Sequence, residues 1–102
     1  MQDFILAKRE EIAELCRHHH VRRLSVFGSA TRDDFNPTRS DIDMLVAFAP
    51  DADPIYAKNY YSLRDNLEGL FHREVDLIGD GVIRNRYRLQ SIEADKVEVY
   101  AA

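Results

Sequence analysis

The sequence predicts an α/β (α+β) protein in which a small mixed β-sheet is flanked by helices. Two stretches carry apolar residues at helical spacing, and three short runs alternate or cluster apolar residues as strands do. Gly, Pro and Asp residues stand between these stretches and mark turns. The chain has 102 residues, which fits one domain spanning residues 1–102.

The first predicted element is a single amphipathic helix over residues 2–19. Its apolar side chains share one stripe at helical spacing: Ile5, Ile12, Leu15 and Cys16. Three consecutive histidines, His18 to His20, stand at its C-terminal end. Because consecutive helical residues point in different directions, they are interpreted as a solvated helix end and not as a metal site.

Two strands are predicted next, at residues 21–27 and 41–48, joined by a polar loop that contains Pro37. We expect a short helical turn at residues 29–34 of this loop. Alternate residues of the second strand form an apolar face: Ile42, Met44, Val46 and Phe48. The opposite face begins with two aspartates and becomes apolar, so we expect the far end of this strand to be buried on both faces.

The remaining elements complete a mixed pattern of helices and strands. Pro50 and Pro54 bracket a predicted turn, and residues 55–70 are predicted as a helix. The helix prediction rests on apolar and aromatic residues at spacings of three and four: Tyr56, Tyr60, Leu63, Leu67 and Leu70. A third strand at 74–79, a helix at 82–93 with a weaker pattern, and a short terminal strand around Val97 and Val99 follow.

Composition and charge narrow the classes of function. The formal net charge is −4, so direct nucleic-acid binding is not expected, although a nucleotide remains compatible with this charge. Cys16 is the only cysteine, which excludes an internal disulfide and a zinc site with several thiolates. No apolar run approaches the ~20 residues that span a bilayer, and the N-terminal segment is charged. We therefore expect no membrane association and a cytoplasmic location.

Two aspartates at positions i and i+2 are the first candidate site residues. On a strand, Asp41 and Asp43 would lie roughly 6.5–7 Å apart and face the same way, a spacing suited to a pair of divalent metal ions. Asp76 is the candidate third ligand and proton acceptor, because a carboxylate within an apolar strand is costly unless it is paired or binds metal. The sequence therefore predicts a metal-dependent phosphoryl-transfer site.

A Gly-Ser pair after the first strand is the second candidate feature. Gly28 allows close approach of a phosphate to the backbone, and Ser29 is expected to begin a helical turn as its N-cap. The hydroxyl of Ser40 and the guanidinium groups of Arg32 and Arg39 lie in the same loop and could contact a triphosphate. Together these residues predict a nucleotide-binding site beside the carboxylates.

This combination resembles the nucleotidyltransferase superfamily that includes DNA polymerase beta and kanamycin nucleotidyltransferase. The resemblance extends over nearly the whole chain, and the short length resembles the minimal nucleotidyltransferases, or MNT domains. It implies phosphate contacts at Gly28 and Ser29, two Mg²⁺ ions at Asp41, Asp43 and Asp76, and ATP as the substrate. It also implies that Asp76 is the catalytic base.

One spacing departs from the family pattern. Eleven residues separate the Gly-Ser pair from the first aspartate, where the family has ten. The extra residue lies in the loop between Arg32 and Arg39, and loop insertions of this size are tolerated. Which loop arginine contacts phosphate therefore stays open.

The resemblance also implies a partner, since MNT proteins commonly pair with a helical HEPN-domain toxin. The predicted function is that of an antitoxin that transfers AMP from ATP to a tyrosine hydroxyl of the HEPN ribonuclease toxin. One alternative is a non-catalytic antitoxin that acts by binding and occlusion, and a second is a nucleotidyltransferase with a small-molecule acceptor. The lack of a recognisable substrate domain counts against the second alternative.

Other readings of the charged residues remain open. Asp76 could be a structural carboxylate paired with Arg73 or with another cation. The cluster of Arg84, Arg86 and Arg88 could bind RNA or nucleotide, but an acidic chain with few neighbouring aromatic residues favours a solvated face or a partner contact.

The predicted second helix carries three tyrosines with two possible roles. Tyr56, Tyr60 and Tyr61 could form an exposed interface, since tyrosine is favoured at protein interfaces. Alternatively, Tyr56 and Tyr60 belong to the core stripe of the helix. The sequence does not separate these two readings.

Overall fold

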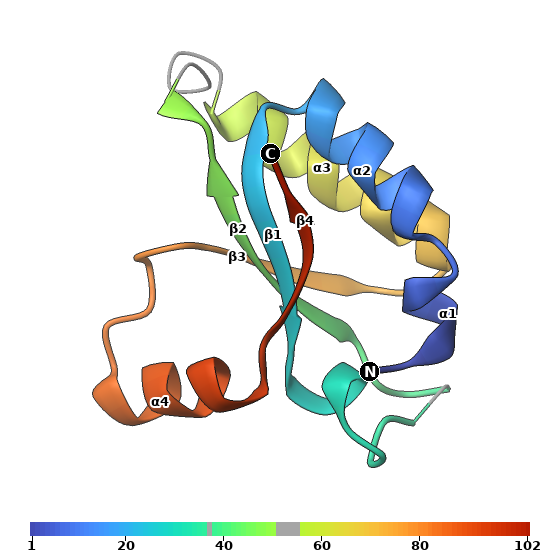
Figure 1. The fold of residues 1–102 in the computed structure, drawn as a ribbon, viewed down its shortest axis with the longest axis vertical. Coiled ribbons are helices and arrows are strands. Elements are labelled where there is room, and N and C mark those ends of the chain that lie inside the picture. The colour runs from blue at the N-terminus through green and yellow to red at the C-terminus, as the bar shows by residue number, and fades with distance from the viewer. Residues whose placement is uncertain (37, 51–55) are drawn as a thin grey trace.

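A four-stranded mixed β-sheet forms the centre of the protein in the computed structural model, which describes residues 1–36, 38–50 and 56–102. The strands lie in the order β3-β2-β1-β4 (Figure 1). β1 pairs antiparallel with both β2 and β4, and β2 pairs parallel with β3. The strand bounds are Val21–Phe27 for β1, Ile42–Phe48 for β2, Val75–Gly79 for β3 and Val97–Ala101 for β4.

Three helices cover one face of this sheet, and the fourth lies apart from them (Figure 1). The α-helices are α1 (Asp3–Leu6), α2 (Arg9–His18), α3 (Tyr56–Phe71) and α4 (Arg86–Asp95). A short 3₁₀ helix, η1 (Gly28–Thr31), follows β1 and contacts α4. The predicted fold class, a small mixed sheet flanked by helices, is confirmed.

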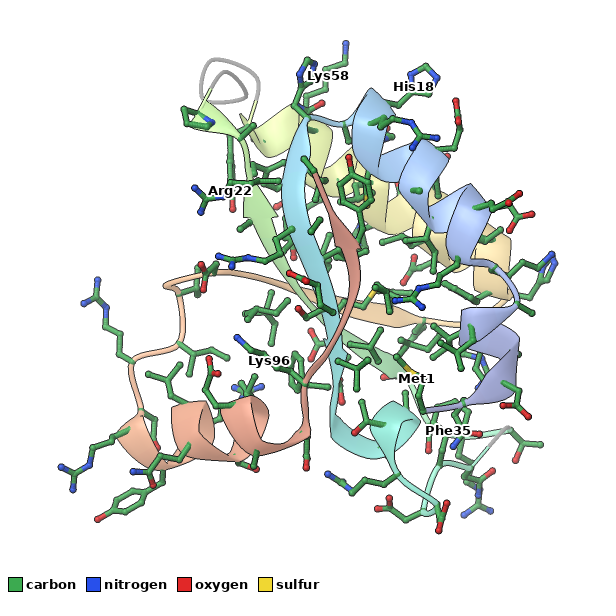
Figure 2. The ribbon with its side chains drawn as sticks, viewed as in Figure 1. Met1, His18, Arg22, Phe35, Lys58 and Lys96 are labelled. Carbon is green, nitrogen blue, oxygen red and sulfur yellow. The ribbon has the colours of Figure 1, made fainter. Side chains whose placement is uncertain are left out.

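The core lies between the sheet and helices α1 to α3, where side chains fill the space, whereas His18 and Lys58 extend into solvent (Figure 2). On β2 the buried side chains alternate with half-buried ones. The expectation that the far end of this strand is buried on both faces is therefore wrong at Leu45 and Ala47, which are only half-buried. None of the helices in the described part of the chain covers this second face as α1 to α3 cover the first, so it stays partly open.

The predicted first helix is interrupted. Its residues form α1 and α2, with a turn at Ala7 and Lys8 between them. No glycine or proline causes the break; instead, α1 directs Phe4 against Phe35 and Phe71, with ring centroids 5.6 and 5.9 Å away. Packing against the loop and α3 thus overrides the helical propensity of this segment.

The predicted helix at 82–93 begins later than expected and ends two residues beyond the expected position. Its start is set by Asn85, whose side-chain oxygen accepts a hydrogen bond from the backbone N–H of Arg88 at 3.0 Å. This is the arrangement that favours asparagine at an N-cap. The turn predicted between Pro50 and Pro54 falls largely on residues 51–55, which lie outside the described residues.

The histidine cluster is only partly a solvated helix end. His18 and His20 are exposed, but His19 is buried and joins α2 to α3. Its Nδ1 donates to the carbonyl oxygen of Leu15 at 2.7 Å, and its Nε2 lies 3.0 Å from the hydroxyl of Ser62. The prediction failed at His19 because α3, distant in sequence, supplies a partner for the ring.

Within the described part of the chain, no helix is both long enough and apolar enough to cross a membrane.

Candidate active site

Two neighbouring strands bring two carboxylates together. The parallel register pairs Asp43 of β2 with Asp76 of β3, on strands that are about 4.8 Å apart in a sheet. Both lie on the partly open face, because the next residues, Met44 and Leu77, are buried against the helices. Asp41 directly precedes β2, is exposed and is two residues from Asp43, so the three predicted carboxylates lie at one end of β2 and β3.

The surroundings of Asp76 differ from those expected from the sequence. Asp76 is exposed, not buried within its strand, because β3 has apolar cover on only one face. The structural alternative, a pair with Arg73, also does not occur among the described residues. The guanidinium of Arg73 instead donates to the carbonyl of Ser40 at 3.3 Å and stacks over Phe4 and Phe35. No cation of the described residues forms an ion pair with Asp76 that would explain this carboxylate as purely structural.

The environment of Asp43 disfavours its charged form. Burial raises the pKa of this carboxyl, and the negative charges of Asp76 and Asp41 raise it further. The positive charges of Arg88 and Arg32 act in the opposite direction but do not cancel these effects. The site thus holds excess negative charge.

Gly28 makes the close approach of η1 to Asp43 possible. A Cβ atom placed on Gly28 would lie 2.5 Å from Oδ2 of Asp43, closer than real contacts allow. Gly28 also has a φ of 74°, a left-handed conformation that favours glycine. The Gly-Ser turn and the carboxylates therefore form one continuous site.

Ser29 lies within η1 and is not its N-cap, a position that Phe27 occupies. The N-cap prediction is wrong because the turn begins one residue earlier, at the left-handed Gly28. Thr31 closes this turn by donating its hydroxyl to the carbonyl oxygen of Gly28 at 2.7 Å. The hydroxyl of half-buried Ser29 has no hydrogen-bond partner within the described chain, so it remains available to a ligand.

The loop residues that were predicted to contact phosphate lie less clearly at the candidate site. The hydroxyl of Ser40 accepts a hydrogen bond from the backbone N–H of Asn36 at 2.9 Å, which holds the loop immediately before Asp41. Arg39 is exposed and its backbone N–H donates to the carbonyl of Asn36. Arg32 forms ion pairs with Asp34 and with Asp95 of α4. The positive charge of Arg32 acts to lower the pKa of Asp43.

Arg88 lies at the candidate site, although the sequence analysis favoured a solvated face or a partner contact for the arginine cluster that contains it. Its charge acts on Asp43, and it lines a pocket of about 160 Å³ with Phe27, Gly28 and Arg32. The α4 residues of this pocket follow helical spacing from the N-cap: Arg88, Ser91, Ile92 and Asp95. Recognising Asn85 as the N-cap would have placed these four positions on one helix face.

The donor set fits a divalent metal ion that arrives with a nucleotide. Among the described residues, no group of three or more His, Cys, Asp or Glu side chains forms a ready metal cage. Mg²⁺ in nucleotide-dependent enzymes usually uses one or two carboxylates together with substrate phosphates. Asp43 and Asp76, adjacent and not neutralised by a cation bonded to either, provide such a pair.

Comparisons with known proteins give consistent matches. The family model described as a nucleotidyltransferase domain matches residues 9–99. A curated protein of Methanocaldococcus jannaschii, named as a candidate protein adenylyltransferase, is 38% identical over 95 residues, which are 93% of this chain and 91% of that protein.

Solved structures share the fold. One, described as a candidate minimal nucleotidyltransferase, superposes with a TM-score of 0.74 at 29% identity over 93% of this chain and 92% of that one. Another, described as a tri-AMPylated Shewanella oneidensis HEPN toxin in complex with MNT antitoxin, gives a TM-score of 0.63 at 19% identity, covering 95% of this chain and 72% of that one.

Proposed function

Since the chain belongs to the nucleotidyltransferase domain family, as its motif predicted, we propose that it transfers AMP from ATP to a hydroxyl of a partner protein. The observation that carries this proposal is the register pair of Asp43 and Asp76 beside the Gly28 turn. A merely structural sheet gains nothing from two adjacent carboxylates whose charges repel, because like charges placed opposite each other are destabilising.

Each site residue has a distinct role in the proposed reaction. Gly28 and the free hydroxyl of Ser29 hold the β- and γ-phosphates, and Arg88 or Arg32 offsets their charge. Asp41, Asp43 and Asp76 hold magnesium, which when bound supplies charge neutralisation at the reacting phosphate. Ser40 and Arg39 shape the loop that leads into Asp41.

The transfer step is an in-line displacement. Asp76 takes the proton of the acceptor hydroxyl, and the acceptor oxygen forms a bond to the α-phosphorus of ATP. The bond from this phosphorus to the oxygen that bridges to the β-phosphate breaks, and pyrophosphate leaves. Positioning and charge neutralisation provide the rate enhancement.

The proposed acceptor is a tyrosine of a HEPN-domain ribonuclease toxin, which makes this protein an antitoxin. The M. jannaschii relative named as a candidate protein adenylyltransferase supports a protein acceptor. The fold shared with an MNT antitoxin from a HEPN complex supports the choice of partner.

Incubation of the purified protein with Mg²⁺, ATP and a HEPN-domain partner tests the proposal. Intact-mass measurement of the partner is expected to show added AMP groups with the wild type and none with the Asp43→Asn variant. Asp80→Asn is the matched control, because Asp80 is an exposed aspartate just after β3 that lies outside the site; this variant should retain transfer.

Two results would contradict the proposal. One is the absence of AMP on the partner with the wild-type protein. The other is full neutralisation of the toxin by an Asp41→Asn, Asp43→Asn double variant, which would instead support an antitoxin that acts by binding and occlusion.

A further inference from the structure

If the proposed function holds, the order of the strands determines the side of the site from which the acceptor hydroxyl enters. Gly28 ends β1, Asp43 lies on β2 and Asp76 lies on β3, and these strands are neighbours in the order β1-β2-β3. In phosphoryl transfer the entering and leaving oxygens lie roughly in line on opposite sides of the phosphorus. With pyrophosphate leaving toward Gly28, the acceptor must enter from the side of Asp76, where β3 forms the edge of the sheet.

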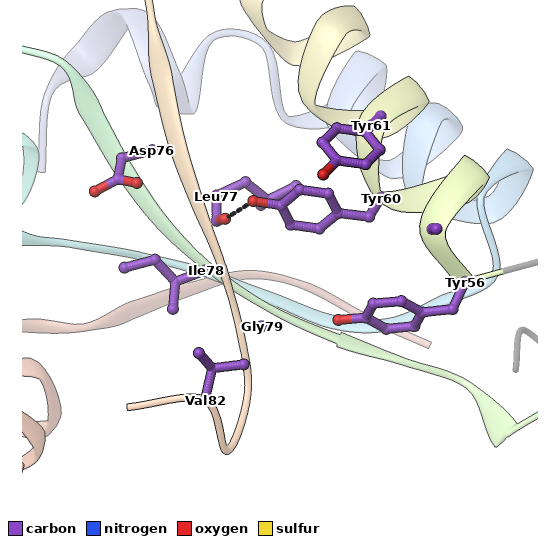
Figure 3. Close-up of a pocket in the computed structure, with 9 residues that line it drawn as sticks. Tyr56, Tyr60, Tyr61, Asp76, Leu77, Ile78, Gly79 and Val82 are labelled. Carbon is purple, nitrogen blue, oxygen red and sulfur yellow. Dashed lines mark hydrogen bonds between the residues drawn. The ribbon is translucent and has the colours of Figure 1, made fainter. Parts of the chain in front are cut away.

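A pocket of about 500 Å³ lies along this edge. In Figure 3, Tyr56, Tyr60 and Tyr61 approach β3 from α3, while Asp76 and Ile78 point to the other side of the strand. Three of the apolar or aromatic lining residues are largely exposed: Tyr56 at 41%, Tyr61 at 54% and Val82 at 66%. Exposed aromatic side chains around a pocket are typical of protein interfaces.

The tyrosines therefore divide between the two roles considered from the sequence. Tyr60 packs against the core and donates its hydroxyl to the backbone carbonyl of Leu77. Tyr61 remains exposed, with its ring edge-on to Tyr60 and the guanidinium of Arg64 5.1 Å from its centroid. A ring held between two neighbours loses little conformational freedom when a partner covers it.

At the β3 edge of the sheet, a partner can bind more readily by covering exposed side chains than by pairing as a further strand. The outward carbonyl of Leu77 is already bonded by Tyr60, and the N–H of Val75 donates to the carboxylate of Glu68 at 3.0 Å. A partner strand would have to displace both bonds before it could add to the sheet. The exposed rings and Val82 can be covered without breaking either bond.

The geometry points to this pocket as the docking site for the segment of the partner protein that carries the acceptor hydroxyl. Apolar or aromatic side chains of that segment pack against Tyr56, Tyr61 and Val82. The hydroxyl then reaches Asp76 around the edge of β3, because Asp76 points to the other side of the strand but lines the same pocket. The occupant is a separate protein chain, and the pocket determines which residue of that chain receives AMP.

The test compares Tyr61→Ala and Val82→Asp with the wild type, using the HEPN-domain protein of the preceding test as the probe. Each variant is expected to raise the KM for this partner, and its Kd measured by calorimetry, by at least about 10-fold, the effect of losing one strong interface contact. The Kd for MgATP should stay within about twofold, because the pocket that these residues line does not include Gly28. Tyr61→Phe keeps the ring and should restore near-normal values.

Tyr87→Ala is the matched control, since Tyr87 is a tyrosine on α4 that is 72% exposed and does not line this pocket. The docking site is wrong if Tyr61→Ala and Val82→Asp leave the KM and Kd for the partner unchanged, or if Tyr87→Ala raises them equally. A wild-type protein that binds the partner but transfers no AMP would overturn the proposed reaction alone. If it neither binds nor transfers, both proposals are wrong.

Discussion

The two faces of the β-sheet are built from alternate residues of the same strands, yet their environments are opposite. On the face covered by α1 to α3, Met44 is fully buried and Leu77 is nearly so. On the other face, their chain neighbours Asp43 and Asp76 form a pair of carboxylates, and the pKa of Asp43 is raised. Neighbouring residues of the same strand thus have different roles: one packs in the apolar core, and the next is a candidate catalytic group.

This difference shows how a small protein can separate stability from chemistry. The covered face gains free energy by burying apolar surface. The open face loses some by holding like charges together, a cost typical of functional sites. Substitutions at the carboxylates of the open face should therefore lower activity, whereas truncations on the covered face should lower stability. Three substitutions test this difference.

The largest expected effect is that of Asp43→Asn on activity. Removal of this carboxylate should lower AMP transfer by about 10³-fold, since charge neutralisation at the phosphate contributes several kcal/mol. The same variant should unfold at a higher temperature at pH 7. The folded state raises the pKa of Asp43, so it binds this proton more tightly than the unfolded chain, and stability is lost as pH rises through the raised value.

The stability gain of Asp43→Asn should disappear in acid, where the wild-type carboxyl is protonated in both states. Thermal unfolding followed by circular dichroism at several pH values measures this dependence. A variant that is less stable than the wild type at pH 7 would contradict the view that the open face is strained by its charges.

Met44→Ala should have the second-largest effect, on stability. Met44 is fully buried, and truncation of a buried Met or Leu to Ala costs about 2–5 kcal/mol. Urea denaturation measures the loss, and the folded fraction should retain AMP transfer. Leu45→Ala, a truncation of the half-buried neighbour on the open face, is the control and should cost clearly less. Equal costs would remove the distinction between the faces.

Gly28→Ala has the smallest expected effect on stability, about 1–2 kcal/mol, from the left-handed backbone. Gly81→Ala is the control, because Gly81 also has a positive φ, of 85°, but a Cβ placed there meets nothing within 4 Å. The Gly28 variant alone should also reduce AMP transfer, since its methyl group displaces Asp43. Equal activity of the two variants would show that the contact between η1 and Asp43 is dispensable.

Strand positions and the carboxylate pair were predictable because they depend on local patterns. Alternation along residues 42–48 correctly indicated which side chains face the core, and it placed Asp43 on the other face. The third strand was also predicted at nearly its observed bounds, and with it the position of Asp76. The parallel register that brings these two aspartates together was not predictable, because it depends on how the intervening α3 packs.

The features that the sequence did not reveal are those set by contacts between distant segments. His19 is buried because Ser62 of α3 meets its ring. The break between α1 and α2 follows from the packing of Phe4 on Phe35 and Phe71. Arg88 reaches the site only because α4 lies beside η1.

The hydrogen bonds from α3 to the edge of β3 have a consequence for the behaviour of the protein in concentrated solution. An exposed strand edge with free backbone groups is a template for pairing with another chain, and so for aggregation. Tyr60 and Glu68 occupy two such groups, on Leu77 and Val75. Preparations in which both residues are replaced should therefore tend to precipitate, even where the fold and the carboxylates are intact.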